Sequence, residues 1–276
     1  MQLNFKNPFQ SLLLVEKQGC YLEQFVHDYA KKIVCLSKEN EFFCNKCINC
    51  LKIDNNNYYD FFIVDGLNEG ITKDKILHIQ NSFMHGGLEE GNKKIYLIKQ
   101  VEKGTKEALN FLLKFLEEPP SHTYAILTTR NENLVLPTIL SRCQKYFLIK
   151  EKNFDFNLLM KKLKISDLEM DILSKLYWTI DDLIFSIKNK DHLEILKFLD
   201  LLLKKIKTID EMGKLQDLFK NLSYRKIELV LNYLLHKLNS KCHENILKIL
   251  SILSINPIKS ALFWEIIKIV EVASNE

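Results

Sequence analysis

The chain has 276 residues and a formal net charge of +4 at pH 7. Its composition, 47% hydrophobic and 27% charged, is that of a soluble globular protein, and so mild a charge does not demand a nucleic-acid partner. No run approaches the roughly 18 apolar residues of a membrane span, and the first ten residues lack the apolar core of a signal peptide. We therefore expect a cytoplasmic protein of two or three domains.

The first half of the chain alternates short apolar runs with helical periodicity. Continuous runs of this kind are typical of strands buried on both faces of a parallel sheet. Helices are predicted at 72–84 and 105–118, the second of which must end before the Pro119–Pro120 pair. This alternation predicts a doubly wound α/β domain over residues 1–150. The predicted strands are 12–15, 61–64, 95–98, 124–127 and 146–149.

Four of the seven cysteines lie within residues 35–50, directly after the first predicted strand and helix. Thiolates at this spacing can bind one metal ion from a tight turn, and four of them complete a closed tetrahedral zinc site with a structural role. The alternative is a group of ordinary buried thiols. The expected zinc ligands are Cys35, Cys44, Cys47 and Cys50, and the cysteines expected to be unligated are Cys20, Cys143 and Cys242.

The second half of the chain, residues 151–276, contains one proline and one glycine and follows helical periodicity throughout. It is predicted to be all-α. A break near 187–192 divides a small helical module, 151–190, from a terminal bundle, 191–276.

Three motifs of the first domain carry a family resemblance. They are LLKFLEEPP at 112–120, LPTI at 136–139 and SRC at 141–143. Together with the placement of the cysteine cluster, they resemble the clamp-loader ATPase-like subunits of bacterial DNA polymerase III, in the AAA+ superfamily. The resemblance implies a RecA-like AAA+ domain with a zinc module, a helical lid over 151–190 and a C-terminal collar over 191–276 that holds subunits together. The N-terminal segment and the collar are shorter than is usual in that family.

The phosphate-binding loop of the family is not preserved. Such a loop needs glycines, so that backbone N–H groups can reach phosphates, and then a lysine and a serine or threonine. After the first strand only Gly19 remains, and the lysine and hydroxyl places fall at about Leu22 and Glu23. A carboxylate there would repel a triphosphate.

Two further parts of the nucleotide site are missing. Lys99 and Gln100 stand where the family places the acidic pair that holds magnesium, and the stretch 176–185 has no lid arginine. We expect that the chain neither binds nor hydrolyses ATP and that Lys99 pairs with Glu23. The gamma/tau ATPase subunit of the family keeps its phosphate loop, so an ATP-inert loader subunit is favoured. The alternatives are a divergent AAA+ ATPase and a zinc-stabilised nucleic-acid-binding protein.

The SRC motif stands out because arginine occurs only at positions 130, 142 and 225, and lysine cannot copy its planar bidentate recognition. By resemblance, Arg142, next to Ser141, reaches in trans to ATP on a neighbouring subunit; the alternative is a plain surface arginine. The implied partners are the gamma/tau and delta subunits, with the sliding clamp and primed DNA reached through the complex.

Three residues near the end of the fourth predicted strand have open roles. Thr128 and Thr129 lie where the family places a polar sensor of the γ-phosphate, or else they are ordinary strand-end residues. Arg130 is either a solvated loop charge or a contact to a partner.

Overall fold

The computed structural model describes residues 7–38, 42–67, 69–84, 86–149, 165–204, 208–253 and 256–274. The chain forms two compact units, Met1–Glu151 and Lys152–Glu276, which are described separately below. The predicted boundary at residue 150 and the first part of the predicted lid, up to residue 164, lie outside the described residues. The division of the helical half into a lid and a collar therefore stays a prediction.

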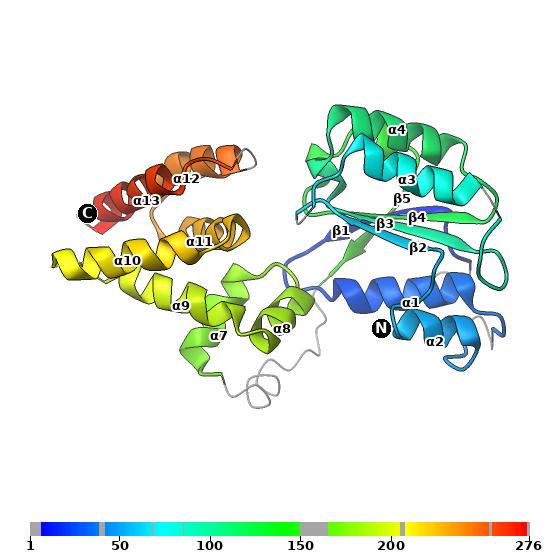
Figure 1. Ribbon diagram of the computed structural model, residues 1–276, viewed down its shortest axis with the longest axis horizontal. Helices are drawn as coiled ribbons and strands as arrows, with labels where there is room; N and C mark the ends of the chain where they lie inside the picture. Colours follow the sequence, from blue (N-terminus) through cyan, green and yellow to red (C-terminus); the bar gives the residue numbers. More distant parts are fainter. Residues whose placement is uncertain are drawn as a thin grey trace. The chain divides into compact units, whose positions relative to one another are not determined.

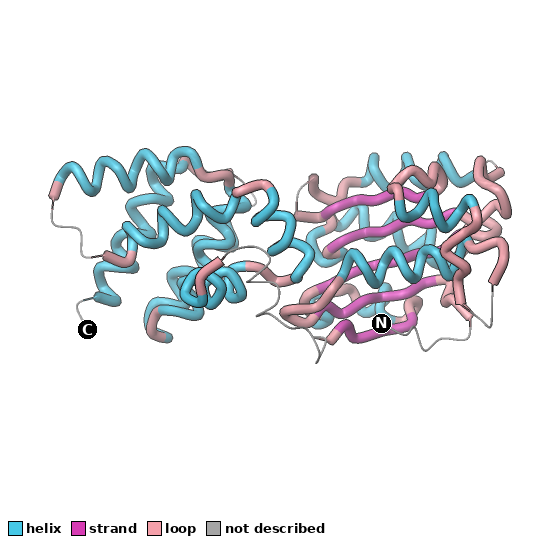
Figure 2. The backbone as a smooth tube through the Cα atoms, turned by 90° about the horizontal axis from the view of Figure 1, so that it is seen from below, coloured by secondary structure: helices cyan, strands magenta, loops and turns pink. Residues whose placement is uncertain are grey.

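The first unit is built on one five-stranded sheet in which every strand pairing is parallel. The strand order is β2-β3-β4-β1-β5, and the sheet lies between two layers of helices (Figures 1 and 2). The predicted α/β sheet is confirmed. The strands are β1 (Ser11–Glu16), β2 (Phe61–Asp65), β3 (Lys94–Lys99), β4 (Thr123–Thr129) and β5 (Gln144–Leu148).

Successive side chains of the central strands point to opposite faces of the sheet, as the period-two geometry of a strand requires. Leu12 and Leu14 pack with α1, whereas Leu13 packs with α3 and α4. Figure 1 shows α1 and α2 on one side of the sheet and α3 and α4 on the other. The elements joining the strands are α1 (Leu22–Val34), α2 (Ile48–Asp54), α3 (Lys73–Met84), η1 (Val101–Lys103), α4 (Lys106–Glu117), η2 (Glu132–Leu134) and α5 (Pro137–Leu140).

Helix α4 shows how the sequence fixes an element beside the site. Thr105 caps it, because its hydroxyl accepts a hydrogen bond from the Ala108 N–H at 3.2 Å. The buried side of the helix includes Leu112 and Phe115, and the Phe115 ring stacks on Tyr96 of β3 with centroids 4.9 Å apart. The helix ends at Glu117, ahead of the proline pair, as predicted.

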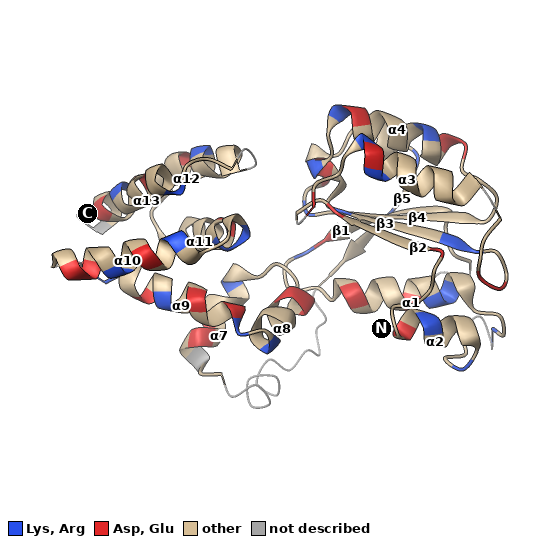
Figure 3. Cartoon of the chain, viewed as in Figure 1, with Lys and Arg blue, Asp and Glu red and all other residues tan. Residues whose placement is uncertain are grey.

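The second unit is all-α in its described part, as expected. Its helices share one hydrophobic cluster, in which Phe219 lies between Phe198 and Phe263 with ring centroids 5.6 and 5.5 Å away. Figure 3 shows acidic and basic residues interspersed along the helices of both units. The helices are α7 (Asp167–Leu176), α8 (Ile180–Lys188), α9 (Asp191–Leu202), α10 (Ile209–Asn221), α11 (Tyr224–Lys237), α12 (Ser240–Ile252) and α13 (Lys259–Ser274).

Candidate functional site

The turn from β1 to α1 is short and holds a single glycine. Gly19 adopts a φ of 79°, in the left-handed region that favours glycine, and the Cys20 N–H donates to the Lys17 carbonyl at 3.1 Å. Leu22 and Glu23, at the places where the family carries a lysine and a hydroxyl, form the first turn of α1.

The predicted ion pair across this position is confirmed. Lys99 Nζ, at the end of β3, pairs with Glu23 Oε1 in the first turn of α1. The lysine side chain is 19% exposed and the glutamate side chain 43%. The positive charge at the end of β3 is thus paired within the chain.

A second internal network lies at the ends of β1 and β4, and its central residue, Glu16, was not predicted from the sequence. Glu16, the last residue of β1, is 1% exposed. Its Oε1 accepts a hydrogen bond from the Thr128 hydroxyl, and its Oε2 lies 3.7 Å from Arg130 Nε. The Gln100 N–H donates to the Thr128 hydroxyl oxygen at 3.1 Å. Thr128 therefore has polar partners inside the chain.

Arg130 completes this network. With the Gln100 amide turned so that its oxygen faces Arg130, that oxygen accepts from Arg130 Nε at 2.8 Å and from Nη2 at 3.0 Å. The Arg130 backbone N–H points to Glu102 Oε1 at 3.3 Å. The side chain of Arg130 is 24% exposed. The sequence left two roles open for Arg130, a solvated loop charge or a contact to a partner. The structure shows a third arrangement, in which Arg130 contacts Glu16 and Gln100 of its own chain.

Arg142 lies apart from that network, just after α5. Its Nη1 donates to the Thr138 carbonyl at 2.8 Å and lies 3.3 Å from the Ser141 hydroxyl, and its Nη2 pairs with Glu117 Oε1. Ser141 also donates from its hydroxyl to the Thr138 carbonyl, at 3.0 Å. The Arg142 side chain is 33% exposed, so its guanidinium can be reached from outside the chain.

The four predicted metal ligands come together. Their sulfur atoms all lie within 4.8 Å of one another, and Cys35 Sγ is 3.6 Å from Cys44 Sγ. A zinc ion with four sulfur ligands at about 2.3 Å needs sulfur atoms about 3.8 Å apart, which fits this cluster. The cluster could hold a zinc ion. Cys35 is the C-cap of α1, Cys44 lies in the connecting loop, Cys47 is the N-cap of α2, and Cys50 lies within α2.

Backbone N–H groups around the cluster favour thiolates. The N–H groups of Lys46 and Cys47 point at Cys44 Sγ, at 3.4 and 3.2 Å, and lower the pKa of Cys44. For Cys47, burial raises the pKa, but backbone N–H donors from Leu36 and Cys50, together with hydrogen bonds to the Cys50 and Cys44 thiols, lower it to about 6. Burial raises the pKa of Cys35 and Cys50. A deprotonated thiol is the form that binds metal.

The three remaining cysteines lie away from the cluster in the described residues. Cys20 and Cys242 are buried in hydrophobic clusters of the two units, and burial raises the pKa of Cys143 to about 12. These are the properties of packed thiols, and the expectation that the three are unligated stays a prediction.

The stretch 176–185 joins the end of α7 to α8, and Thr179 caps α8 by accepting from the Asp182 N–H at 3.1 Å. An arginine does reach α8, but from elsewhere: Arg225 of α11 lies 3.4 Å from the Asp182 carboxylate. This contact ties α11 to α8 within the second unit.

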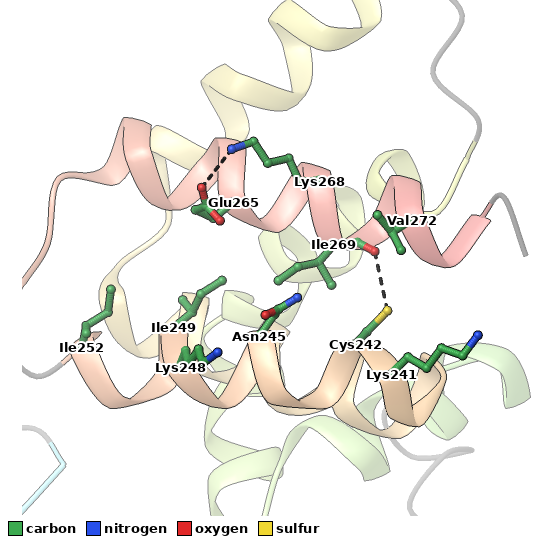
Figure 4. A pocket seen from close by; sticks show the side chains of 10 residues that line it. All are labelled: Lys241, Cys242, Asn245, Lys248, Ile249, Ile252, Glu265, Lys268, Ile269 and Val272. Carbon is green, nitrogen blue, oxygen red and sulfur yellow. Dashed lines mark hydrogen bonds and ion pairs between the residues drawn. The ribbon is translucent and has the colours of Figure 1, made fainter.

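A groove of about 420 Å³ runs between α12 and α13 (Figure 4). Its apolar floor includes Ile249 and Ile269, and lysines stand along it at positions 241, 248 and 268. The Cys242 thiol donates to the Ile269 carbonyl at 3.9 Å and thereby joins the two helices.

An all-parallel sheet in this order, with helices on both faces and a helical unit after it, defines the AAA+ class of fold. A gamma subunit-related protein of DNA polymerase III from Thermotoga maritima has the same fold, with a TM-score of 0.60 at 19% identity, over 97% of this chain and 96% of that one. A family model described as "DNA polymerase III, delta subunit" matches residues 2–152. The chain belongs to this family of clamp-loader-type DNA polymerase III subunits.

Two relatives are similar to this chain over different lengths. An uncharacterised protein of Mycoplasma pneumoniae is 30% identical over 95% of this chain and 98% of its own length. The delta' subunit of DNA polymerase III from Bacillus subtilis is 43% identical over 117 residues, which are 42% of this chain but only 34% of that protein. In the described part of the chain, no helix is long and apolar enough to cross a membrane.

Proposed function

We propose that the chain is a delta-prime-type subunit of a DNA polymerase III clamp loader. It is ATP-inert, lends Arg142 in trans to a neighbouring gamma/tau ATPase subunit, and joins the delta subunit in loading the sliding clamp on primed DNA during replication. One observation carries this proposal: the strand ends where a nucleotide would bind are joined by ion pairs within the chain, while Arg142 stays accessible.

ATP-inertness is supported by charge and by geometry. The Glu23 carboxylate would face the triphosphate, and like charges at such distances repel strongly in a partly buried site. Lys99 and Arg130, which could have offset that repulsion, are already paired with Glu23 and Glu16. A divergent ATPase would have to break both pairs before it could bind nucleotide.

The contribution of Arg142 rests on its exposure and on the chemistry of guanidinium groups. An arginine supplied by a neighbouring subunit stabilises the charge that develops during phosphoryl transfer, and this can contribute about 10³ to 10⁵ in rate. Arg142 presents such a group within the SRC motif, directly after the short helix α5 that Pro137 begins.

The structural zinc and the collar complete the proposal. Four thiolates leave no coordination position open, so the ion would hold the loop between α1 and α2 and take no part in a reaction. The second unit would hold the subunit in the complex, and exposed apolar residues of its last helix, such as Trp264 and Val272, fit such a contact surface.

A zinc-dependent nucleic-acid-binding protein is less well supported, since acidic and basic residues are mixed along the helices (Figure 3).

Calorimetric titration of the isolated chain with magnesium and ATP tests the inert site. We expect no binding heat at cellular ATP concentrations, because the strand ends are filled by internal pairs. The gamma/tau subunit of the same loader serves as the positive control. Saturable binding by the isolated chain would contradict the proposal and favour a divergent ATPase.

A further inference from the structure

Arg142 is held by two separate elements of the first unit. Glu117, the last residue of α4, provides a carboxylate oxygen to Nη2, and the Thr138 carbonyl at the start of α5 accepts from Nη1 at 2.8 Å. The Ser141 hydroxyl is a third contact, at 3.3 Å from Nη1. Within the described residues, these contacts leave the Nε–H and one Nη2–H of the guanidinium to be offered to another molecule.

The helix itself gains nothing from an acid at position 117. A carboxylate in the last turn lies at the negative end of the helix dipole, where a cation is preferred. The pair with Arg142 offsets this unfavourable placement. Exposed ion pairs contribute little to the stability of a fold. The main effect of this pair is therefore on the orientation of the Arg142 side chain.

We propose that Glu117 is a positioning residue for Arg142. Its carboxylate and the Thr138 carbonyl fix one edge of the guanidinium, so that the opposite edge is presented to the γ-phosphate bound by the neighbouring subunit. This inference rests on the proposed function of Arg142. An arginine side chain has many rotamers, and fixing it before the subunits meet lowers the entropy lost when it engages the phosphate.

Chemical modification of the isolated chain tests the pair without any partner. Phenylglyoxal reacts with arginine, and mass spectrometry can follow each site separately because the chain has only three arginines, at 130, 142 and 225. Glu117→Gln should raise the modification rate of Arg142 about two- to fivefold, the range expected for an exposed ion pair, and leave Arg225 unchanged. Glu118→Gln, at the next exposed residue, is the matched control. An unchanged rate at Arg142 would overturn the inference.

Steady-state ATP hydrolysis by the reconstituted loader tests the positioning role. Glu117→Gln should lower kcat about two- to fivefold with the KM for ATP unchanged, whereas Glu117→Asp retains most of the rate and Glu118→Gln all of it. In the Arg142→Ala background, Glu117→Gln should cause no further loss, which a merely structural role would not predict.

Failures of the two proposals can be told apart. If Arg142→Ala lowers the rate and Glu117→Gln does not, the inference about Glu117 is wrong and the proposed function stands. A faster rate with Glu117→Gln also overturns it, because the carboxylate would then be holding the arginine back. If Arg142→Ala has no effect, both proposals fall.

Discussion

Glu16 carries a carboxylate that is almost fully buried at the end of β1. A buried charge of this kind is costly unless it is paired and hydrogen-bonded. Arg130 and Thr128 provide those partners from the end of the neighbouring strand, β4. The Glu16 carboxylate thus has polar partners within the chain.

Arg130→Ala tests this network. The substitution removes the Arg130 guanidinium from the buried Glu16 carboxylate, and we expect a loss of about 3 kcal/mol in the free energy of unfolding, at the low end for buried pairs because Arg130 is partly exposed. Urea denaturation measures this loss. Lys145→Ala, which breaks an exposed pair with Glu132 in the same unit, should cost less than about 1 kcal/mol. Equal effects of the two substitutions would show that the network is not what we describe.

The two strand-end pairs differ in how far they could be predicted. By resemblance, Glu23 and Lys99 occupy two positions of the same nucleotide site, so their contact could be predicted from the sequence. The Glu16–Arg130 pair depends on β1 lying beside β4 with Val15 opposite Thr129, which brings the next residue of each strand together. Sequence spacing alone does not reveal that neighbour relation, although an assumed strand order would have.

At the scale of elements, the apolar runs located every strand because parallel strands are buried on both faces. Their ends were less well predicted. Lys94, Thr123 and Gln144 belong to the strands through backbone pairing, which hydrophobicity does not report. The helix at 105–118 was well placed because both of its ends carry strong local signals, a threonine cap and a proline pair.

The grouping of the four cysteines around one metal site was also predictable, because cysteines separated by two residues are typical of zinc ligands. Its surroundings were not. Lys31 of α1 lies 2.9 Å from the Asn45 side-chain oxygen in the CNKC turn, 2.9 Å from Asp54 of α2, and 4.8 Å from the centre of the Phe43 ring. These contacts tie the loop to both helices that flank it.

Removing two ligands tests the metal centre. The intact chain should carry about one zinc ion, and the Cys44→Ser/Cys47→Ser chain none, as measured by elemental analysis. The Cys20→Ser/Cys242→Ser chain is the control and should keep its zinc. Stoichiometric zinc in the chain without Cys44 and Cys47 would contradict a four-thiolate site.

At the scale of the whole molecule, the chain has ion pairs at the ends of its central strands and an accessible arginine at position 142. This combination is the basis of its proposed role. The family follows from the match of the family model over residues 2–152. The role of a single arginine cannot be predicted in the same way, because it depends on a neighbour that the chain does not contain. Only the assembled loader can show whether Arg142 acts in trans.

The most direct test is the rate of ATP hydrolysis by the reconstituted loader with clamp and primed DNA. It compares the intact chain, Arg142→Ala and Arg225→Ala as the control, together with the isolated chain. We predict no hydrolysis by the isolated chain, normal assembly of all three complexes, and a large loss of rate with Arg142→Ala alone. Turnover by the isolated chain, or an unchanged rate with Arg142→Ala, would contradict an inert subunit that lends its arginine.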